Sequence, residues 1–97
     1  MQAMDDTAIA ARMDEIPGWT IEDGKLTRSY TFADFVAAFG FMTSVALEAE
    51  KAGHHPEWFN VYNRVRVQMT THDAGGITDK DFALAARMNA LAASADR

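Results

Sequence analysis

The chain has 97 residues, which is enough for one small domain, and we expect a single domain over residues 1–97. Its net charge of −5 and the lack of a basic stripe argue against direct binding to nucleic acid or to an anionic membrane surface. The absence of cysteine excludes disulfides and thiolate chemistry. The first residues contain no apolar run typical of a signal peptide, and no apolar segment is long enough to cross a bilayer, so we expect a cytoplasmic protein.

The first predicted element is a helix over residues 6–16. Apolar side chains recur on one helical face at Ile9, Met13 and Ile16. Asp6 or Thr7 is expected to cap the start of this helix, because a side-chain oxygen there accepts from a free backbone amide. Pro17, followed by glycine, is expected to end it.

A β-hairpin is predicted over residues 19–30. Asp23-Gly24 is typical of a type I′ turn, because both central residues of that turn need a positive φ. Counting outward from the turn predicts the cross-strand pairs Glu22–Lys25, Ile21–Leu26, Thr20–Thr27 and Trp19–Arg28. Turn chemistry and side-chain pairing therefore indicate the same hairpin.

The longest predicted helix covers residues 31–52. Thr31 and Asp34 resemble a capping box at its start, and Gly53 is placed to end it. One apolar stripe consists of Phe35, Phe39, Met42, Ala46 and Ala49, and a second of Ala37, Ala38, Phe41 and Val45. A sheet covers only one side of a helix, so we expect the other side to meet a second copy of the chain. The alternative is that the two end helices of the same chain cover it.

Two more strands are predicted over residues 57–62 and 64–72. In the second, apolar residues and Thr71 alternate with a polar set that ends at His72. A last helix is predicted over residues 78–94, with Thr78 and Asp81 as its capping box. The order helix, two strands, helix, two strands, helix predicts an α+β fold: a four-stranded antiparallel sheet with three helices packed on one face.

The residues best suited to acid–base chemistry are the three histidines. His54 and His55 follow a helix end and precede Pro56, which favours an extended backbone at His55. In a tight hairpin the end of the second strand returns to the start of the first, so His72 is expected to come back near this pair. That convergence predicts a shared acid–base or ligand site, with Trp58 as a flat wall for a planar substrate.

Other interpretations of these residues remain open. Three histidines can form a zinc site, but adjacent histidines in an extended segment point to opposite sides and chelate poorly. They can also be unrelated surface residues. The capping box alone explains Asp81, and Glu57 either orients an imidazole or is simply solvated.

Beyond these general arguments, the run from Glu50 to Asn63, which contains His54-His55-Pro56-Glu57-Trp58, resembles the pterin-4a-carbinolamine dehydratase family. Thr70-Thr71-His72-Asp73 and Asp81 continue the resemblance. It implies dehydration of a 4a-hydroxytetrahydropterin to quinonoid dihydropterin, which recycles the cofactor of aromatic amino acid hydroxylases. No metal and no organic cofactor are implied.

The resemblance also implies the site residues. The catalytic set is His54, His55, His72 and Asp81. The substrate-binding set is Gly53, His54, His55, Pro56, Trp58, Thr70, Thr71, His72 and Asp73. For the chemistry we expect His54 as the acid on the hydroxyl, His72 as the base and His55 holding the pterin.

The same resemblance implies partners. Members of the family assemble through their long helix, which agrees with the two apolar stripes and predicts a dimer or tetramer through residues 31–52. Some members double as dimerisation cofactors of a homeodomain transcription factor, and some relatives serve in the assembly of a carbon-fixing enzyme. A non-catalytic protein-interaction module is therefore the alternative function, and the intact histidine set favours the enzyme.

Overall fold

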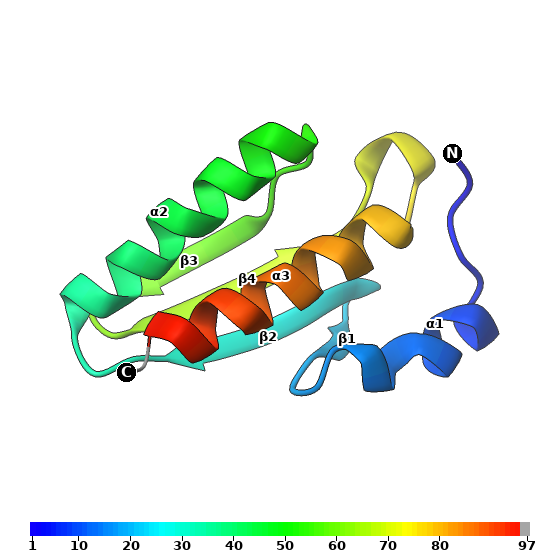
Figure 1. The fold of residues 1–97 in the computed structure, drawn as a ribbon. Helices are drawn as coiled ribbons and strands as arrows, with labels where there is room; N and C mark the ends of the chain where they lie inside the picture. Colours follow the sequence, from blue (N-terminus) through cyan, green and yellow to red (C-terminus); the bar gives the residue numbers. More distant parts are fainter. Residues whose placement is uncertain (96–97) are drawn as a thin grey trace.

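The computed structural model describes residues 1–95, so Asp96 and Arg97 of the expected domain lie outside the described residues. The elements in chain order are α1 (Asp6–Arg12), β1 (Thr20–Glu22), β2 (Lys25–Thr31), α2 (Phe35–Ala52), β3 (Glu57–Val61), β4 (Arg64–Met69) and α3 (Asp79–Ala95). Short 3₁₀ turns follow α1 and β4, at Met13–Glu15 and His72–Ala74. The predicted order of helices and strands is confirmed (Figure 1).

The four strands form one antiparallel sheet in the order β1-β2-β4-β3. Asp23 and Gly24 have φ values of 54° and 73°, as a type I′ turn requires. The predicted pairs are confirmed for Thr20–Thr27, Ile21–Leu26 and Glu22–Lys25. β1 begins at Thr20, so the expected Trp19–Arg28 pair is not part of the ladder, and both side chains donate instead to Oδ1 of Asn89 on α3.

The core lies between one face of the sheet and the helices. Val65, Val67 and Met69 of β4 are almost completely buried on this face, as their alternation with polar residues predicted. α2 and α3 run side by side across it, and α1 lies beside the β1–β2 hairpin (Figure 1). Arg12 of α1 stacks on the ring of Phe82 of α3, 4.5 Å from its centroid, which joins the two end helices. The predicted α+β fold is confirmed.

The start of α1 differs from the prediction. Asp5, rather than Asp6 or Thr7, caps the helix by accepting a 2.8 Å hydrogen bond from the amide of Ala8. The α-helix ends at Arg12 and continues as a 3₁₀ turn to Glu15. The periodic apolar residues spanned both segments because a 3₁₀ turn keeps side chains on nearly the same face.

The start of α2 is a larger correction. Thr31 belongs to β2, where it pairs with Arg64, so it does not form a capping box. Asp34 is itself the N-cap, and its carboxylate accepts a 2.8 Å hydrogen bond from the amide of Ala37. The chain stays attached to the sheet until Phe32, whose amide donates to the carbonyl of Asn63.

The two sides of α2 have different environments. Ala38, Phe41, Val45 and Ala49 are buried, whereas Phe35, Val36, Phe39 and Leu47 are exposed. The second predicted stripe therefore faces the core, and the larger part of the first, including Phe39 at 55% exposure, is left uncovered by this chain. The alternative in which the end helices cover that side is wrong for these side chains. Within residues 1–95, none of the helices combines the length and the apolar character needed to cross a bilayer.

Candidate functional site

An open cleft of about 210 Å³ lies between the end of α2 and the loop after β4. Its lining residues are Gly53, His54, His55, Thr70, Thr71, His72, Asp73 and Lys80. Three of these are the histidines of the sequence. The predicted convergence of His72 on the adjacent pair is therefore confirmed.

The end of α2 presents the first two histidines. Gly53 has a φ of 64°, a left-handed conformation that favours glycine and closes the helix. The amide of His54 then donates to the carbonyl of Ala49 at 3.1 Å, which turns the chain out of the helix. The side chain of His54 is 10% exposed and that of His55 is 64% exposed, so the two neighbours have different environments.

His54 contacts a fully buried carboxylate. Its Nε2 lies 2.5 Å from Oδ1 of Asp81, whose side chain has no exposed surface. Oδ2 of Asp81 accepts hydrogen bonds from the hydroxyl of Thr71 at 2.8 Å and the backbone amide of Thr78 at 2.9 Å. The second bond confirms one half of the predicted capping box, although Oγ1 of Thr78 accepts from the amide of Lys80 instead of that of Asp81. Asp81 therefore serves helix capping and His54 together.

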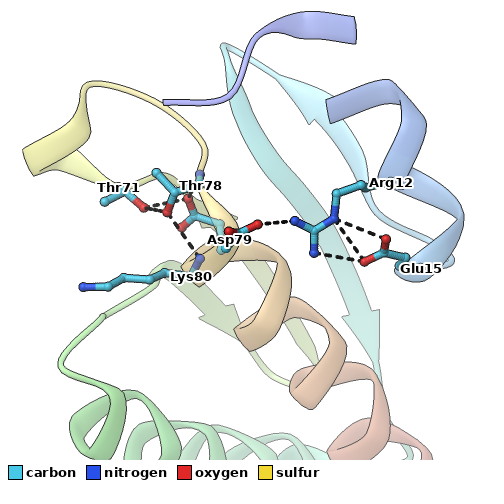
Figure 2. A network of polar contacts seen from close by, with 7 residues as sticks. Arg12, Glu15, Thr71, Thr78, Asp79 and Lys80 are labelled. Carbon is cyan, nitrogen blue, oxygen red and sulfur yellow. Dashed lines mark hydrogen bonds and ion pairs between the residues drawn. The ribbon is translucent and has the colours of Figure 1, made fainter. Parts of the chain in front are cut away.

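The start of α3, which carries Asp81, is attached to α1. Figure 2 shows Thr71 and Thr78 meeting at the start of α3, where Arg12 also reaches the carboxylate of Asp79. Arg12 bonds Glu15 as well, and these two carboxylates raise the pKa of its guanidinium. The start of α3 is thus held from two sides.

The other two histidines lie at the exposed rim of the cleft, each beside a glutamate. Nε2 of His55 is 2.9 Å from Oε1 of Glu50, and Nε2 of His72 is 3.2 Å from Oε2 of Glu57. Lys25 bonds the second oxygen of Glu57 at 2.8 Å. The hydrogen bond from Lys25, with a smaller contribution from His72, lowers the pKa of Glu57. Glu57 therefore lies beside an imidazole, as one of its two interpretations predicted, and its side chain is also 41% exposed.

His72 is not in a strand, contrary to the prediction. β4 ends at Met69, and His72 begins a 3₁₀ turn. The carbonyl of Thr71 accepts hydrogen bonds from the amides of Ala74 and Gly75 at 3.1 and 3.0 Å. These bonds close a turn, so the strand does not continue to His72. His72 still lines the cleft, because this turn lies near the end of α2, where His54 and His55 follow the helix.

Some predicted site residues lie outside the cleft lining. Trp58 faces the core side of β3, where it opposes Val67 and packs against the core, and Pro56 also does not line the cleft. Asp81 is behind His54 rather than in the lining. Lys80, one residue before Asp81, also lines the cleft and was not predicted from the sequence. Its position in the first turn of α3 was the only feature that could have indicated this role.

This arrangement supports proton transfer. One imidazole is buried against a carboxylate, and two others at the rim have carboxylates within hydrogen-bonding distance. Among residues 1–95, there is no group of three or more potential metal ligands of the His, Asp and Glu type. The fold and cleft define a small antiparallel α+β protein with one cleft lined by three histidines.

Known proteins extend this class to a family. The model of the pterin 4 alpha carbinolamine dehydratase family matches residues 2–91. A Solibacter usitatus protein named "Putative pterin-4-alpha-carbinolamine dehydratase" is 59% identical over 90 residues, covering 93% of this chain and 95% of that protein. A Rhizobium johnstonii protein of the same name is 52% identical over 95 residues, covering 96% and 94%. The chain belongs to the pterin-4a-carbinolamine dehydratase family.

Solved structures agree with this assignment. A Brucella melitensis protein described as a transcriptional coactivator/pterin dehydratase superposes with a TM-score of 0.90 at 45% identity, covering 94% of this chain and 99% of its own. A pterin dehydratase-like RuBisCO assembly factor of the alpha-carboxysome superposes with a TM-score of 0.63 at 23% identity, covering 76% and 86%. At that identity the second match shows a shared fold only.

Proposed function

We propose that the protein dehydrates a 4a-hydroxytetrahydropterin to the quinonoid dihydropterin by histidine acid–base catalysis. The acid donates a proton to the 4a hydroxyl, the C4a–O bond breaks and water leaves. The base removes the proton from N5, and its electron pair forms the N5=C4a double bond. The observation that carries the proposal is one cleft lined by all three histidines, with the most buried of them paired to Asp81.

The roles of the side chains follow from their partners. His54 is the acid, because its Nε2 is held by the fully buried carboxylate of Asp81 and its side chain is only 10% exposed. His72 is the base, and its Nε2 lies 3.2 Å from Oε2 of Glu57 at the exposed rim of the cleft. His55, at the same rim, holds the pterin, together with the cleft segments Gly53–His55 and Thr70–Asp73. Pro56 and Trp58 lie outside the cleft lining, so this proposal gives them no contact with the pterin.

The experiment follows dehydration by absorbance after an aromatic amino acid hydroxylase has produced the 4a-hydroxy adduct. We expect the native protein to accelerate loss of the adduct, and His54→Ala or His72→Ala to abolish most of the acceleration with the fold retained. Each substitution removes a proton-transfer group, which contributes on the order of 10²–10⁴-fold. Unchanged turnover in both variants would reject the mechanism, and the absence of acceleration by the native protein would reject the activity.

A specific observation supports a second property, assembly of copies through α2. Phe35, Val36, Phe39 and Leu47 are exposed along one side of this helix, an arrangement typical of an interface between subunits. We propose a homo-oligomer, a dimer or tetramer, formed through this side. As an alternative to catalysis, the same side of α2 suits a protein-interaction module. A native protein that does not accelerate dehydration in the assay would favour that function.

A further inference from the structure

Two buried hydroxyls form a directed hydrogen-bond chain behind His54. Thr71 and Thr78 are 6% and 1% exposed, and their Oγ1 atoms lie 2.7 Å apart. A hydroxyl has only one hydrogen, and that of Thr71 is donated to Oδ2 of Asp81. In the contact between the hydroxyls, Thr78 must therefore donate and Thr71 must accept. The chain runs in one direction, from Thr78 to Thr71 to Asp81.

This chain determines which oxygen of Asp81 is left for His54. Oδ2 already accepts from the hydroxyl of Thr71 and the backbone amide of Thr78, so Oδ1 faces Nε2 of His54. An ionised carboxylate only accepts hydrogen bonds, so His54 donates from Nε2. Nδ1 is then the ring nitrogen that carries the proton donated to the substrate when His54 acts as the acid.

The backbone of Thr71 holds the loop that carries the third histidine. Its carbonyl accepts from the amides of Ala74 and Gly75, and its amide donates to the carbonyl of Gly76 at 3.0 Å. The turn beginning at His72 is therefore wound around Thr71. The side chain of Thr71 is thus linked to His54 through Asp81, and its backbone bonds hold the turn that begins at His72.

We infer that Thr71, supported by the hydroxyl of Thr78, is a positioning residue that sets the tautomer and orientation of His54 through Asp81. This inference rests on the proposed function for its kinetic consequence, whereas the geometry of the imidazole is independent of turnover. It also changes the role expected for Thr71, because a hydroxyl donated to Asp81 is not available to donate to a substrate. The opposing interpretation is that the two hydroxyls merely satisfy each other in a buried region.

Three variants separate these interpretations. Thr71→Val removes the hydroxyl at almost constant volume and leaves the backbone bonds of the His72 turn. Thr71→Ser restores the hydroxyl. Thr27→Val is the matched control, because Thr27 is 2% exposed and its hydroxyl also makes two hydrogen bonds, in the sheet and away from the cleft lining.

The first readout is the ¹⁵N chemical shifts of the imidazole nitrogens, measured by NMR without substrate at alkaline pH, where an imidazole is neutral and has a tautomer. We expect the native His54 to show one tautomer protonated at Nε2, and Thr71→Val to move its two nitrogens toward averaged values. The shifts of His72 should remain native in that variant, which also shows that the fold is intact. Thr71→Ser and Thr27→Val should keep the native His54 pattern.

The second readout is dehydration kinetics. We expect Thr71→Val to lower kcat about tenfold or more with little change in KM, because misplacing a catalytic group by about 1 Å costs on the order of 100-fold. Thr71→Ser should recover most of the rate, and Thr27→Val should leave it unchanged. A native His54 spectrum in Thr71→Val, or a native kcat beside a changed spectrum, overturns the inference. If the native protein shows no dehydration, the proposed function fails, and the NMR comparison still decides the positioning role.

Discussion

The replacement Asp81→Asn tests the buried carboxylate with almost no change in shape. Asp81 accepts three hydrogen bonds, from His54, Thr71 and the amide of Thr78. In the variant the amide oxygen can still accept from the two threonines, so its NH₂ group faces Nε2 of His54. Two donors cannot share that contact, so the imidazole must accept at Nε2 and carry its hydrogen on Nδ1.

The expected magnitudes follow from this count of bonds. A hydrogen bond to a charged group contributes about 1.5–3 kcal/mol and a neutral one about 0.5–1.5 kcal/mol, so neutralising the acceptor of three bonds costs about 3–4.5 kcal/mol. Relief from burying a charge offsets part of this loss, and we expect the free energy of unfolding to fall by about 1–2 kcal/mol. For kcat we expect a loss on the order of 100-fold, because His54 no longer donates from Nε2 to a carboxylate that orients it.

The assay combines urea unfolding with dehydration kinetics, and Asp79→Asn is the matched control. Asp79 is two residues earlier on α3, its side chain is 82% exposed, and it bonds Arg12 rather than a cleft residue. The control should keep the native kcat, because its carboxylate does not contact a histidine. An Asp81→Asn variant that retains the native kcat would refute the reasoning that His54 depends on this carboxylate.

Three further outcomes are expected. Phe39→Glu should reduce the molar mass measured by sedimentation, because it charges the exposed side of α2, whereas Phe59→Glu on the open sheet face should not; an equal mass for native protein and Phe39→Glu contradicts the interface. Lys25→Met should lower the free energy of unfolding at neutral pH, because it removes the ion pair between Lys25 and Glu57. Because the folded-state pKa of Glu57 lies below its ordinary 4.5, this difference should vanish as the pH falls through that lowered value, and a difference that persists in acid would exclude the ion pair as its cause. Asn89→Ala should destabilise the fold by about 2–4 kcal/mol, since it leaves three side-chain donors without their shared acceptor, and a variant as stable as the native protein in urea would contradict this.

Local patterns in the sequence were sufficient to predict the two hairpins and the position of the cleft. Asp23-Gly24 determined the register of the first hairpin, because a two-residue turn leaves only one pairing of the flanking strands. The return of the second hairpin brought His72 back to His54, although the exact conformation of His72 was predicted incorrectly. Convergence depended on topology, which a shift of two or three residues does not change.

Contacts between distant segments were not predictable from local patterns. Thr31 with Asp34 matches a capping box, and only the pairing of Thr31 with Arg64 shows that the strand continues there. Asn89 gave no periodic or motif signal, yet its side-chain oxygen joins α3 to the hairpin through Arg28 and two aromatic residues. Such residues satisfy buried polar groups of other elements, and their partners become visible only when the chain is folded.

The central claim is that three imidazoles surround one planar substrate, and titration with an unreactive dihydropterin tests it most directly. The imidazole signals of His54, His55 and His72 are followed by NMR as the ligand is added. The account predicts that all three shift together and reach saturation at one equivalent of ligand. Shifts confined to a single histidine, or no saturable shift at any of them, would contradict it.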